Sequence, residues 1–442
     1  MRTLEDWVAR LSNDPFTIEC PHMSLCGFPD HEPPIFEGSG HIEIKRRDLI
    51  GFKMHAVPRD GTDALRKLIA SVSYPYDIEV QFRLFATDYG GIEWACGWTS
   101  PQIETRSKDR WLLSGILNGL TTHLSGDRVS KISSAELVFC PSPYVPLGEP
   151  LIQTALIGSE EVSRKISGGR YKCTVLDAEI EIMKEAWTDN LWIISTTSPE
   201  FQHPHIENWL SEPLGVLCGE FVYPRLTARN FGDGRAFVQI RPSPVLPRRV
   251  PGYATRFLGQ GNPTERFWGF YTRYLLYVAT WKSPDGSLGF EANKITRFYQ
   301  EIMQAAQGSR WMLSLSLASA VEGIVRILAD PKEMTSDFPT LDVDSIGKHV
   351  EAWNGLPEIR QRLLSAVSDL YKRTTSSYLN KLVQQNVISG DHRQAWNHIR
   401  NQVMHGSLGE PWSSESVDDK IENLLELVHI LTGKLVNDDL SL

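Results

Sequence analysis

Hydrophobic and polar positions follow two different spacings along this chain. Between about residues 35 and 245, segments rich in β-branched and aromatic residues alternate apolar with polar positions, and Gly, Asp and Pro separate them. Two short stretches there, DALRKLIASV and WLLSGILNGL, are expected to be helical. After residue 262, apolar positions recur at helical spacing in the runs TERFWGFYTRYLLYVATW, NKITRFYQEIMQAA, SRWMLSLSLASAVEGIVRILAD, PEIRQRLLSAVSDLYKR, YLNKLVQQNVI, DHRQAWNHIRNQVMHG and DDKIENLLELVHILTGKLV. The sequence therefore predicts an α+β protein, in which a β-rich N-terminal region of sandwich or barrel-like sheets precedes an all-α bundle.

Two proline-rich segments mark the expected boundaries, because repeated prolines disfavour the interiors of helices and sheets. PSPYVPLGEP (141–150) is expected to divide the β-rich region into two subdomains. RPSPVLPRRVPG (241–252) is expected to link that region to the bundle. We therefore expect a sensing or regulatory region at 1–250 and a helical domain at 262–442.

Composition and charge restrict the class of protein. The 442 residues carry a net charge of −9, which argues against a protein that coats nucleic acid non-specifically but leaves room for one small basic site. The N-terminal MRTLEDWVARLSNDP has no apolar core or cleavage pattern, so a signal peptide is not expected. Six cysteines without such a signal are expected to be reduced thiols, and the protein to be cytoplasmic.

The run 391–406 is expected to be a helix with one buried and one polar side. Asp391 is a suitable N-cap, and Gly406 stands where a glycine ends a helix. Trp396, Ile399 and Val403 recur at helical spacing and form the expected buried stripe. At about 100° per residue, the other side carries polar and flexible residues. These are Arg393, Asn397, Arg400, Asn401, Met404 and His405.

The polar side of this helix contains the parts for phosphoryl transfer without a metal. His405 lies in the last turn, where the helix dipole favours the imidazolium form, and a histidine moves protons in both directions. Arg400 is a permanent cation suited to a phosphate or a charged transition state. Asn401 lies one turn before His405 and is placed to orient the imidazole or a phosphate oxygen.

The spacing alone is a weak signal, because about half a match to Arg-x4-His is expected by chance in a chain this long. Arg393 and His398 form a second such pair in the same helix, and they are expected to be solvent-facing or structural. Requiring Asn after the arginine and Gly after the histidine lowers the chance rate several hundredfold, on the order of the product of two residue frequencies.

RNQVMHG near the end of a helical bundle resembles the R-N-x3-H-G motif of HEPN domains. Glu322 in ASAVEGIVRIL resembles the acidic residue found on an earlier HEPN helix. The phrases FEGSGHIEI, LGVLCGEFVYPR and DGRAFVQI resemble the N-terminal domain that accompanies HEPN in ApeA-type abortive-infection proteins. The resemblance covers most of the chain and is most specific in the C-terminal motif.

This resemblance implies an anti-phage, metal-independent endoribonuclease that needs no cofactor and acts as a homodimer through its HEPN domains. The RNA 2′-hydroxyl would attack the neighbouring phosphate and give a 2′,3′-cyclic phosphate, with tRNA as the expected substrate and a phage protein as a candidate trigger. His405 would be the general acid or base, Arg400 would stabilise the transition state, and Asn401 and Glu322 would position groups. Arg393 and Asn397, on the same side of the helix, are candidate RNA contacts.

Other interpretations remain open. The motif can be a fortuitous match on a solvated helix face, and Glu322 an ordinary carboxylate paired with Arg326 at i+4. The bundle would then be a catalytically silent interaction module, and the β-rich region a sensor of a phage ligand or a scaffold. In a third hypothesis, the HEPN domain binds or is modified by a nucleotide and stays silent until a partner acts.

Weaker candidates lie in the first region. One is a zinc site, although its spacing is unlike a standard zinc knuckle and an irregular loop is the more ordinary interpretation; its residues are Cys20, His22, Cys26 and His31. A weaker metal candidate comprises His203, His205 and Cys218. A basic RNA-binding surface, as opposed to scattered solvated arginines, would comprise Arg225, Arg229, Arg235, Arg248 and Arg249.

Overall fold

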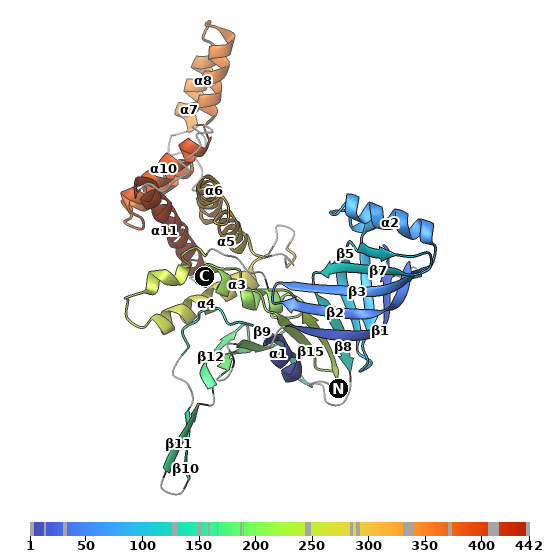
Figure 1. Ribbon diagram of the computed structural model, residues 1–442. Helices are drawn as coiled ribbons and strands as arrows, with labels where there is room; N and C mark the ends of the chain where they lie inside the picture. Colours follow the sequence, from blue (N-terminus) through green and yellow to red (C-terminus); the bar gives the residue numbers. More distant parts are fainter. Residues whose placement is uncertain are drawn as a thin grey trace. The chain divides into compact units, whose positions relative to one another are not determined.

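The chain divides into a β-rich unit and a helical unit. A computed structural model describes residues 4–12, 15–29, 33–125, 131–147, 152–157, 160–165, 167–185, 188, 190–243, 249–282, 286–288, 292–329, 340–369, 374–404 and 415–438. The β-rich unit comprises Met1–Leu246 with Arg256–Ala292, and the helical unit comprises Pro247–Thr255 with Asn293–Leu442. The α+β class expected from the two spacings is therefore confirmed (Figure 1).

Most strands of the β-rich unit join one antiparallel sheet of 14 strands, in the order β12-β13-β14-β9-β15-β16-β8-β5-β4-β1-β2-β3-β7-β6. Its first strands are β1 (Phe16–Cys26), β2 (Phe36–Arg46), β3 (Leu49–Pro58), β4 (Phe82–Thr87), β5 (Glu93–Thr99), β6 (Gln102–Arg106), β7 (Trp111–Leu117) and β8 (Leu120–Ser125). The later strands are β9 (Ser133–Phe139), β12 (Ser167–Val175), β13 (Ala178–Glu185), β14 (Leu191–Thr196), β15 (Leu226–Phe231) and β16 (Arg235–Ile240). A separate antiparallel pair comprises β10 (Ile152–Ile157) and β11 (Glu160–Lys165).

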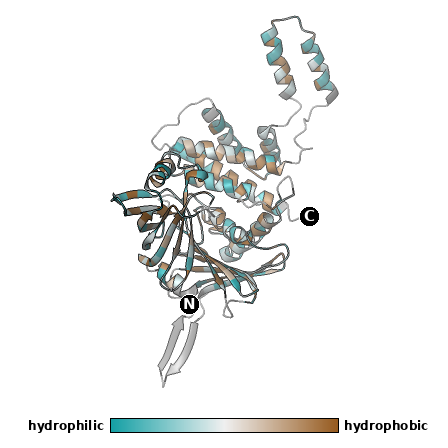
Figure 2. Cartoon of the chain, turned by 90° about the vertical axis from the view of Figure 1, so that its right-hand side faces the viewer, coloured by the Kyte–Doolittle hydropathy of each residue, from teal (hydrophilic) through white to brown (hydrophobic). Residues whose placement is uncertain are grey.

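The first half of this sheet curls round a core. A Cβ placed on Gly115 of β7 would lie 2.9 Å from the Thr99 hydroxyl of β5, so these two strands approach each other although they are not neighbours in the sheet. The helix α2 (Gly61–Ser73) lies at one end of the curled strands (Figure 1). The helix α1 (Leu4–Ser12) places Trp7 edge-on against Trp94, with 5.1 Å between the ring centroids. Hydrophobic and hydrophilic residues alternate along the strands (Figure 2).

Two expectations for this region are wrong. WLLSGILNGL forms the strand β7 and the turn up to the first residue of β8, not a helix, and buried and less buried side chains alternate along most of β7. Cys20, His22 and Cys26 lie on the strand β1, where an irregular loop was expected. The predicted helix DALRKLIASV is confirmed as α2. The short segments at 88–92 and 232–234 join β4 to β5 and β15 to β16.

The boundary between the units differs from the expected one at 250–262. The helix α4 (Pro263–Thr280) belongs to the β-rich unit, where it packs on α3 (Ile206–Cys218) and β12. Trp268 stacks on Tyr171 of β12, with 4.8 Å between the ring centroids, and the Tyr271 hydroxyl donates to the Leu210 carbonyl at 2.8 Å. Aromatic residues therefore attach α4 to the sheet rather than to the bundle.

The helical unit contains α5 (Lys294–Ala305), α6 (Arg310–Leu328), α7 (Thr340–Glu351), α8 (Pro357–Asp369), α9 (Thr375–Gln384), α10 (Gly390–Met404) and α11 (Glu415–Asp438). The helix α6 packs on α5, α9, α10 and α11, and α7 packs on α8. By length and composition alone, α6 is the one described helix long and apolar enough to cross a membrane. Of this stretch 33% is buried, including Leu317, Val321 and Ile324.

The segment before α4 is part of the helical unit. Tyr253 lies edge-on to the imidazole of His429 on α11. The Pro251 carbonyl can only accept, so Nε2 of His429 donates to it at 3.0 Å. The Tyr299 hydroxyl of α5 lies 2.8 Å from Nδ1 of His429 and 3.3 Å from the Thr432 hydroxyl. These contacts join residues 251–253, α5 and α11.

Candidate functional site

The helix α10 begins one residue earlier than expected, and Ser389 caps it where Asp391 was expected. The Ser389 hydroxyl accepts from the backbone N–H of His392 at 3.2 Å. The backbone N–H of Ser389 donates to Nδ1 of His392 at 3.1 Å. These reciprocal bonds satisfy donors at the helix start in the manner of a capping box, with His392 in the place usually taken by Glu or Gln. Asp391 lies in the first turn, where a carboxylate complements the helix dipole.

The buried stripe fixes how α10 lies on α6. Trp396 and Ile399 are buried as expected. The indole N–H of Trp396 donates to the Ala318 carbonyl of α6 at 3.4 Å. Since both helices are held by this contact, residues one turn further along each of them are brought together.

Arg400 and Glu322 form the centre of the candidate site. Arg400 Nε donates to Glu322 Oε1 at 3.0 Å, across α10 and α6. The guanidinium carbon also lies 5.8 Å from the centroid of the Trp396 ring. The Arg400 side chain is 42% exposed and that of Glu322 is 29% exposed, so the pair lies at the surface of the bundle within reach of solvent.

A second arginine adds positive charge to this pair. Arg326 lies one turn after Glu322 on α6, and its Nη2 is 4.0 Å from Glu322 Oε2. The site therefore contains two guanidinium groups and one carboxylate. The bond to Glu322 uses only the Nε–H of Arg400, whose guanidinium carries four further N–H donors. This arrangement can hold a phosphate or a similar oxyanion.

The other predicted residues of α10 differ in their exposure and in the helices that they contact. Asn401 is exposed beside Arg400, and Asn397 is half-buried one turn before it. Arg393 donates to Asn380 of α9, so its guanidinium contributes to the contact between α9 and α10 rather than extending freely toward RNA. His398 lies 3.4 Å from Lys420 of α11.

The structure thus separates the second Arg-x4-His pair, because Arg393 and His398 contact different helices. The same spacing places Arg400 and His405 about 140° apart round a regular helix. His405 and Gly406 lie outside the described residues, as do the side chains of Val403 and Met404. The expected role of His405 therefore stays a prediction.

The candidate metal-ligating side chains do not form a metal site among the described residues. Within the described ranges, no group of three or more His, Cys, Asp or Glu side chains is placed to hold a metal ion. Cys20 and Cys26 are buried on β1, whereas His22 is exposed; His31 lies outside the described part. In the second candidate, His203 Nδ1 lies 2.6 Å from Glu207 Oε1, and His205 stacks on Trp209.

The proposed arginine surface is not formed as expected. Arg225 is buried, and Arg229 Nε lies 2.9 Å from the buried Glu207 carboxylate. Arg235 donates through Nε to Asp233 at 2.8 Å, which holds the pKa of that carboxyl below its usual value. Arg249 is exposed, and Arg248 lies outside the described residues. Burial and pairing of Arg225 and Arg229 leave no continuous basic surface along this group.

Sequence reasoning missed some contributors to the site. Trp396 was assigned to the core, but its ring also supports the Arg400 guanidinium. The signal was present, since an aromatic residue four positions before an arginine lies on the same side of a helix. Arg326 was considered only as a partner that would make Glu322 ordinary, and the structure places it in the same cluster as Arg400.

Comparison of the chain with protein-family models, with curated proteins and with solved structures finds no match.

Proposed function

We propose that this protein is a metal-independent endoribonuclease of the HEPN type, acting in defence against phage. The observation that carries the proposal is the contact between Arg400 and Glu322 on helices that are 78 residues apart in sequence. The motif on α10 and the acidic residue on α6 were both selected from the same family resemblance, and their side chains lie within hydrogen-bond distance of each other. This contact supports the proposal, because the resemblance requires the two residues to lie in one site.

The proposed mechanism divides the chemistry among the motif residues. His405 removes the proton from the RNA 2′-hydroxyl, whose oxygen attacks the adjacent phosphorus and displaces the 5′-oxygen of the next nucleotide. The products are a 2′,3′-cyclic phosphate and a 5′-hydroxyl, which receives a proton. Arg400 stabilises the negative charge on the phosphorane-like transition state. Glu322 and Trp396 hold the guanidinium in place, and Asn401 orients the phosphate or His405.

The proposed enzyme is a homodimer whose two motifs face one RNA cleft. The site on one chain offers few cations, since Arg400 and Arg326 are offset by Glu322. The whole chain carries a charge of −9, so general attraction to RNA is weak. Two copies of the site on one folded RNA would double the number of phosphate contacts. We therefore propose one folded RNA, of the tRNA class, as the substrate.

Cleavage of total cellular RNA in the presence of EDTA tests this function. The wild-type chain is compared with His405→Ala and Arg400→Ala, and RNA ends are analysed for 2′,3′-cyclic phosphates. We expect EDTA-resistant cleavage by the wild type and a loss of about a thousandfold in both variants, as for removal of a group essential to the transition state. The matched control is His398→Ala, which removes the histidine of the second Arg-x4-His pair and should cleave within about threefold of wild type.

Two results would contradict the proposal. One is cleavage that persists in His405→Ala, since it would belong to another site or to a contaminant. The other is no cleavage by the wild type, either alone or with extract of phage-infected cells. The bundle would then be an interaction module, and the β-rich unit would be the place to look for function.

A further inference from the structure

The sheet of the β-rich unit opens into a fork between β5 and β8. These strands pair only at Ala95 with Thr121 and at Cys96 with Leu120. Beyond Ala95, β5 still contains Trp94 and Glu93, and β8 continues to Ser125. On their other sides both strands stay paired, β5 with β4 and β8 with β16. Within the part of the chain that the structure describes, the two facing edges therefore carry backbone groups without a neighbouring strand.

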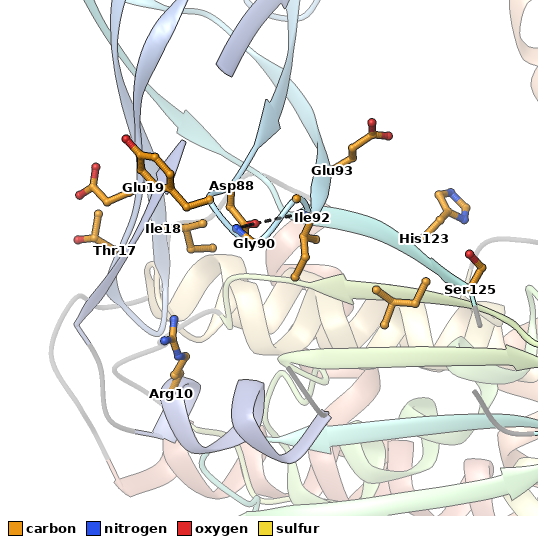
Figure 3. A pocket seen from close by; sticks show the side chains of 13 residues that line it. Arg10, Thr17, Ile18, Glu19, Asp88, Gly90, Ile92, Glu93, His123 and Ser125 are labelled. Atoms are coloured by element: carbon orange, nitrogen blue, oxygen red, sulfur yellow. Dashed lines mark hydrogen bonds between the residues drawn. The ribbon is translucent and has the colours of Figure 1, made fainter. Parts of the chain in front are cut away.

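A cavity of about 640 Å³ lies at the mouth of this fork (Figure 3). Ile18, Ile92 and Leu124 line it with apolar side chains from β1, the β4–β5 turn and β8. A second hollow of about 920 Å³ shares Glu93 and His123 with the first. The two hollows therefore meet at the fork, and together they offer both apolar surface and strand edges to a ligand.

Two buried polar atoms lie where the fork opens. The indole N–H of Trp94 and the hydroxyl of Thr122 are buried and have no hydrogen-bond partner within the described residues. Continuing the β5–β8 register by one step would pair these two residues with each other. Both residues also line the second hollow. An unmade hydrogen bond of a buried group is costly, so a ligand that supplies partners here gains free energy.

The rim of the two hollows is acidic. Glu19 and Glu93 line the first, and Glu37 and Glu93 line the second; all three side chains are exposed. Asp88 adds a fourth carboxylate, although it accepts from the backbone N–H groups of Gly90 and Ile92 and so holds the turn. Arg10 of α1 is the one arginine or lysine among the lining residues that the structure describes. The rim therefore favours a cationic ligand.

We propose that this fork binds an extended, positively charged peptide segment of a partner protein. The backbone of the segment would pair with the free edges of β5 and β8, as in recognition by strand addition. Successive side chains of a strand point to opposite faces, so alternate residues would contact Ile18, Ile92 and Leu124 while the residues between them carry lysine or arginine to Glu19 and Glu93. This site does not depend on the proposed ribonuclease activity.

Binding of a designed peptide to the full chain tests the proposal. The probe is a fluorescein-labelled heptapeptide of alternating lysine and valine, followed by fluorescence anisotropy. A glutamate–valine peptide of the same length tests charge. A lysine–valine peptide that is N-methylated at alternate residues tests backbone pairing, because it lacks the N–H donors of one edge. We expect the first peptide to bind and each of the other two to bind at least about tenfold more weakly.

Matched variants locate the binding. Glu93→Lys reverses the charge of the carboxylate that lines both hollows and should weaken binding of the lysine–valine peptide at least about tenfold. Asp109→Lys makes the same kind of change at an exposed position of the β6–β7 turn and should leave binding within about twofold. Circular dichroism and thermal unfolding establish that the variants are folded.

Three results would overturn the proposal. The first is equal binding of the three peptides, and the second is an equal loss of binding in the Asp109 and Glu93 variants. The third is no binding of the lysine–valine peptide at about 1 mM, where even a weak complex of about 4 kcal/mol is populated. The first result would indicate no dependence on charge or backbone pairing, the second general electrostatic attraction, and the third no site.

Discussion

Glu322 contacts Arg400 and Arg326 with different geometry. The two contacts therefore have different roles: the first positions a guanidinium, and the second is a surface ion pair. Arg400 Nε donates to Glu322 at 3.0 Å, whereas Arg326 approaches only to 4.0 Å and its side chain is 72% exposed. An exposed pair at the longer distance contributes little to stability. The bond to Arg400 instead fixes the direction of a guanidinium that we propose acts on RNA.

We predict that Glu322→Gln lowers the rate of RNA cleavage by about ten- to a hundredfold, because a neutral amide holds the guanidinium less firmly. Arg326→Ala should change the rate by less than about threefold. Single-turnover rates at saturating enzyme measure both effects, and unfolding in denaturant measures stability separately. Equal losses in the two variants would show that the local charge matters and the position of Arg400 does not.

Two buried thiols give a prediction for pH. Burial, with the charges of Asp88 and Glu19, raises the pKa of Cys20 to about 12. Burial raises the pKa of Cys96 well above its usual value. The folded chain favours the neutral thiols, so the stability they contribute is fully present below about pH 9, the pKa of an ordinary thiol, and is lost as pH rises through the folded-state pKa.

We therefore expect iodoacetamide at pH 8 to leave Cys20 and Cys96 unmodified in the folded chain and to modify both in denaturant. The denaturant midpoint should fall between pH 7.5 and 10.5. Peptide mass mapping and equilibrium unfolding provide the two measurements. Rapid labelling of Cys20 in the folded chain would mean that β1 opens, and it would also reopen the zinc interpretation of this segment.

At the scale of elements, most helices of the second half were predictable because they bury an apolar stripe and end at a polar or glycine-rich segment. The run 391–404 shows this, with Trp396 and Ile399 buried at the expected spacing. The helix α7 was not predicted, and among its described side chains only Val343 is buried. WLLSGILNGL was assigned wrongly, because a short apolar run has no periodicity that separates a strand from a helix. The helix α3 was missed for a related reason, since it is buried on nearly all sides and contains Pro213.

The close approach of the β2 and β3 backbones at Gly40 could not be predicted from the sequence. A Cβ on Gly40 would lie 2.0 Å from the Lys53 carbonyl oxygen and 2.9 Å from Met54 Cα, both backbone atoms of β3. The motif GSG in FEGSGHIEI was noticed for its resemblance, and its physical role is to let two strands approach closely.

We predict that Gly40→Ala lowers the free energy of unfolding by at least about 3 kcal/mol, because backbone atoms of a paired strand cannot move aside as a side chain can. The matched control is Gly61→Ala at the start of α2, where a Cβ would meet nothing within 4 Å. That variant should be neutral or more stable by up to about 1 kcal/mol. Urea unfolding of both variants measures the difference, and a tolerated Gly40→Ala would show that β2 and β3 are less closely paired than described.

At the scale of the whole molecule, the change from strands to helices was predictable, but the boundary between the units was not. Periodicity shows that 263–280 is a helix and says nothing of what the helix packs against. Phe267, Phe270, Tyr271 and Tyr274 recur at i, i+3, i+4 and i+7 and form one buried stripe of α4, but a stripe does not identify the surface that it packs on. The Pro-rich segment at 241–252 was expected to be a linker, yet its last residues join the helical unit with 253–255.

The position of α4 leads to the last prediction, which concerns fragments of the chain. Residues 1–292 should be soluble and unfold cooperatively, because they retain α4 with its contacts to Tyr171 and Leu210. Residues 1–262 end at the boundary that the sequence suggests, and they should aggregate or lose cooperative unfolding. Each large aromatic side chain of α4 buries about 150–250 Å², and removing several of them exposes the matching surface of α3 and β12.

Size-exclusion chromatography and thermal unfolding of the two fragments distinguish these outcomes, with the full chain as the reference. Equal solubility and equal melting temperatures would mean that α4 contributes nothing to the β-rich unit, and the unit boundary would return to residues 250–262. A difference in the expected direction would instead show that aromatic packing, which no periodicity reveals, decides the unit in which a helix folds.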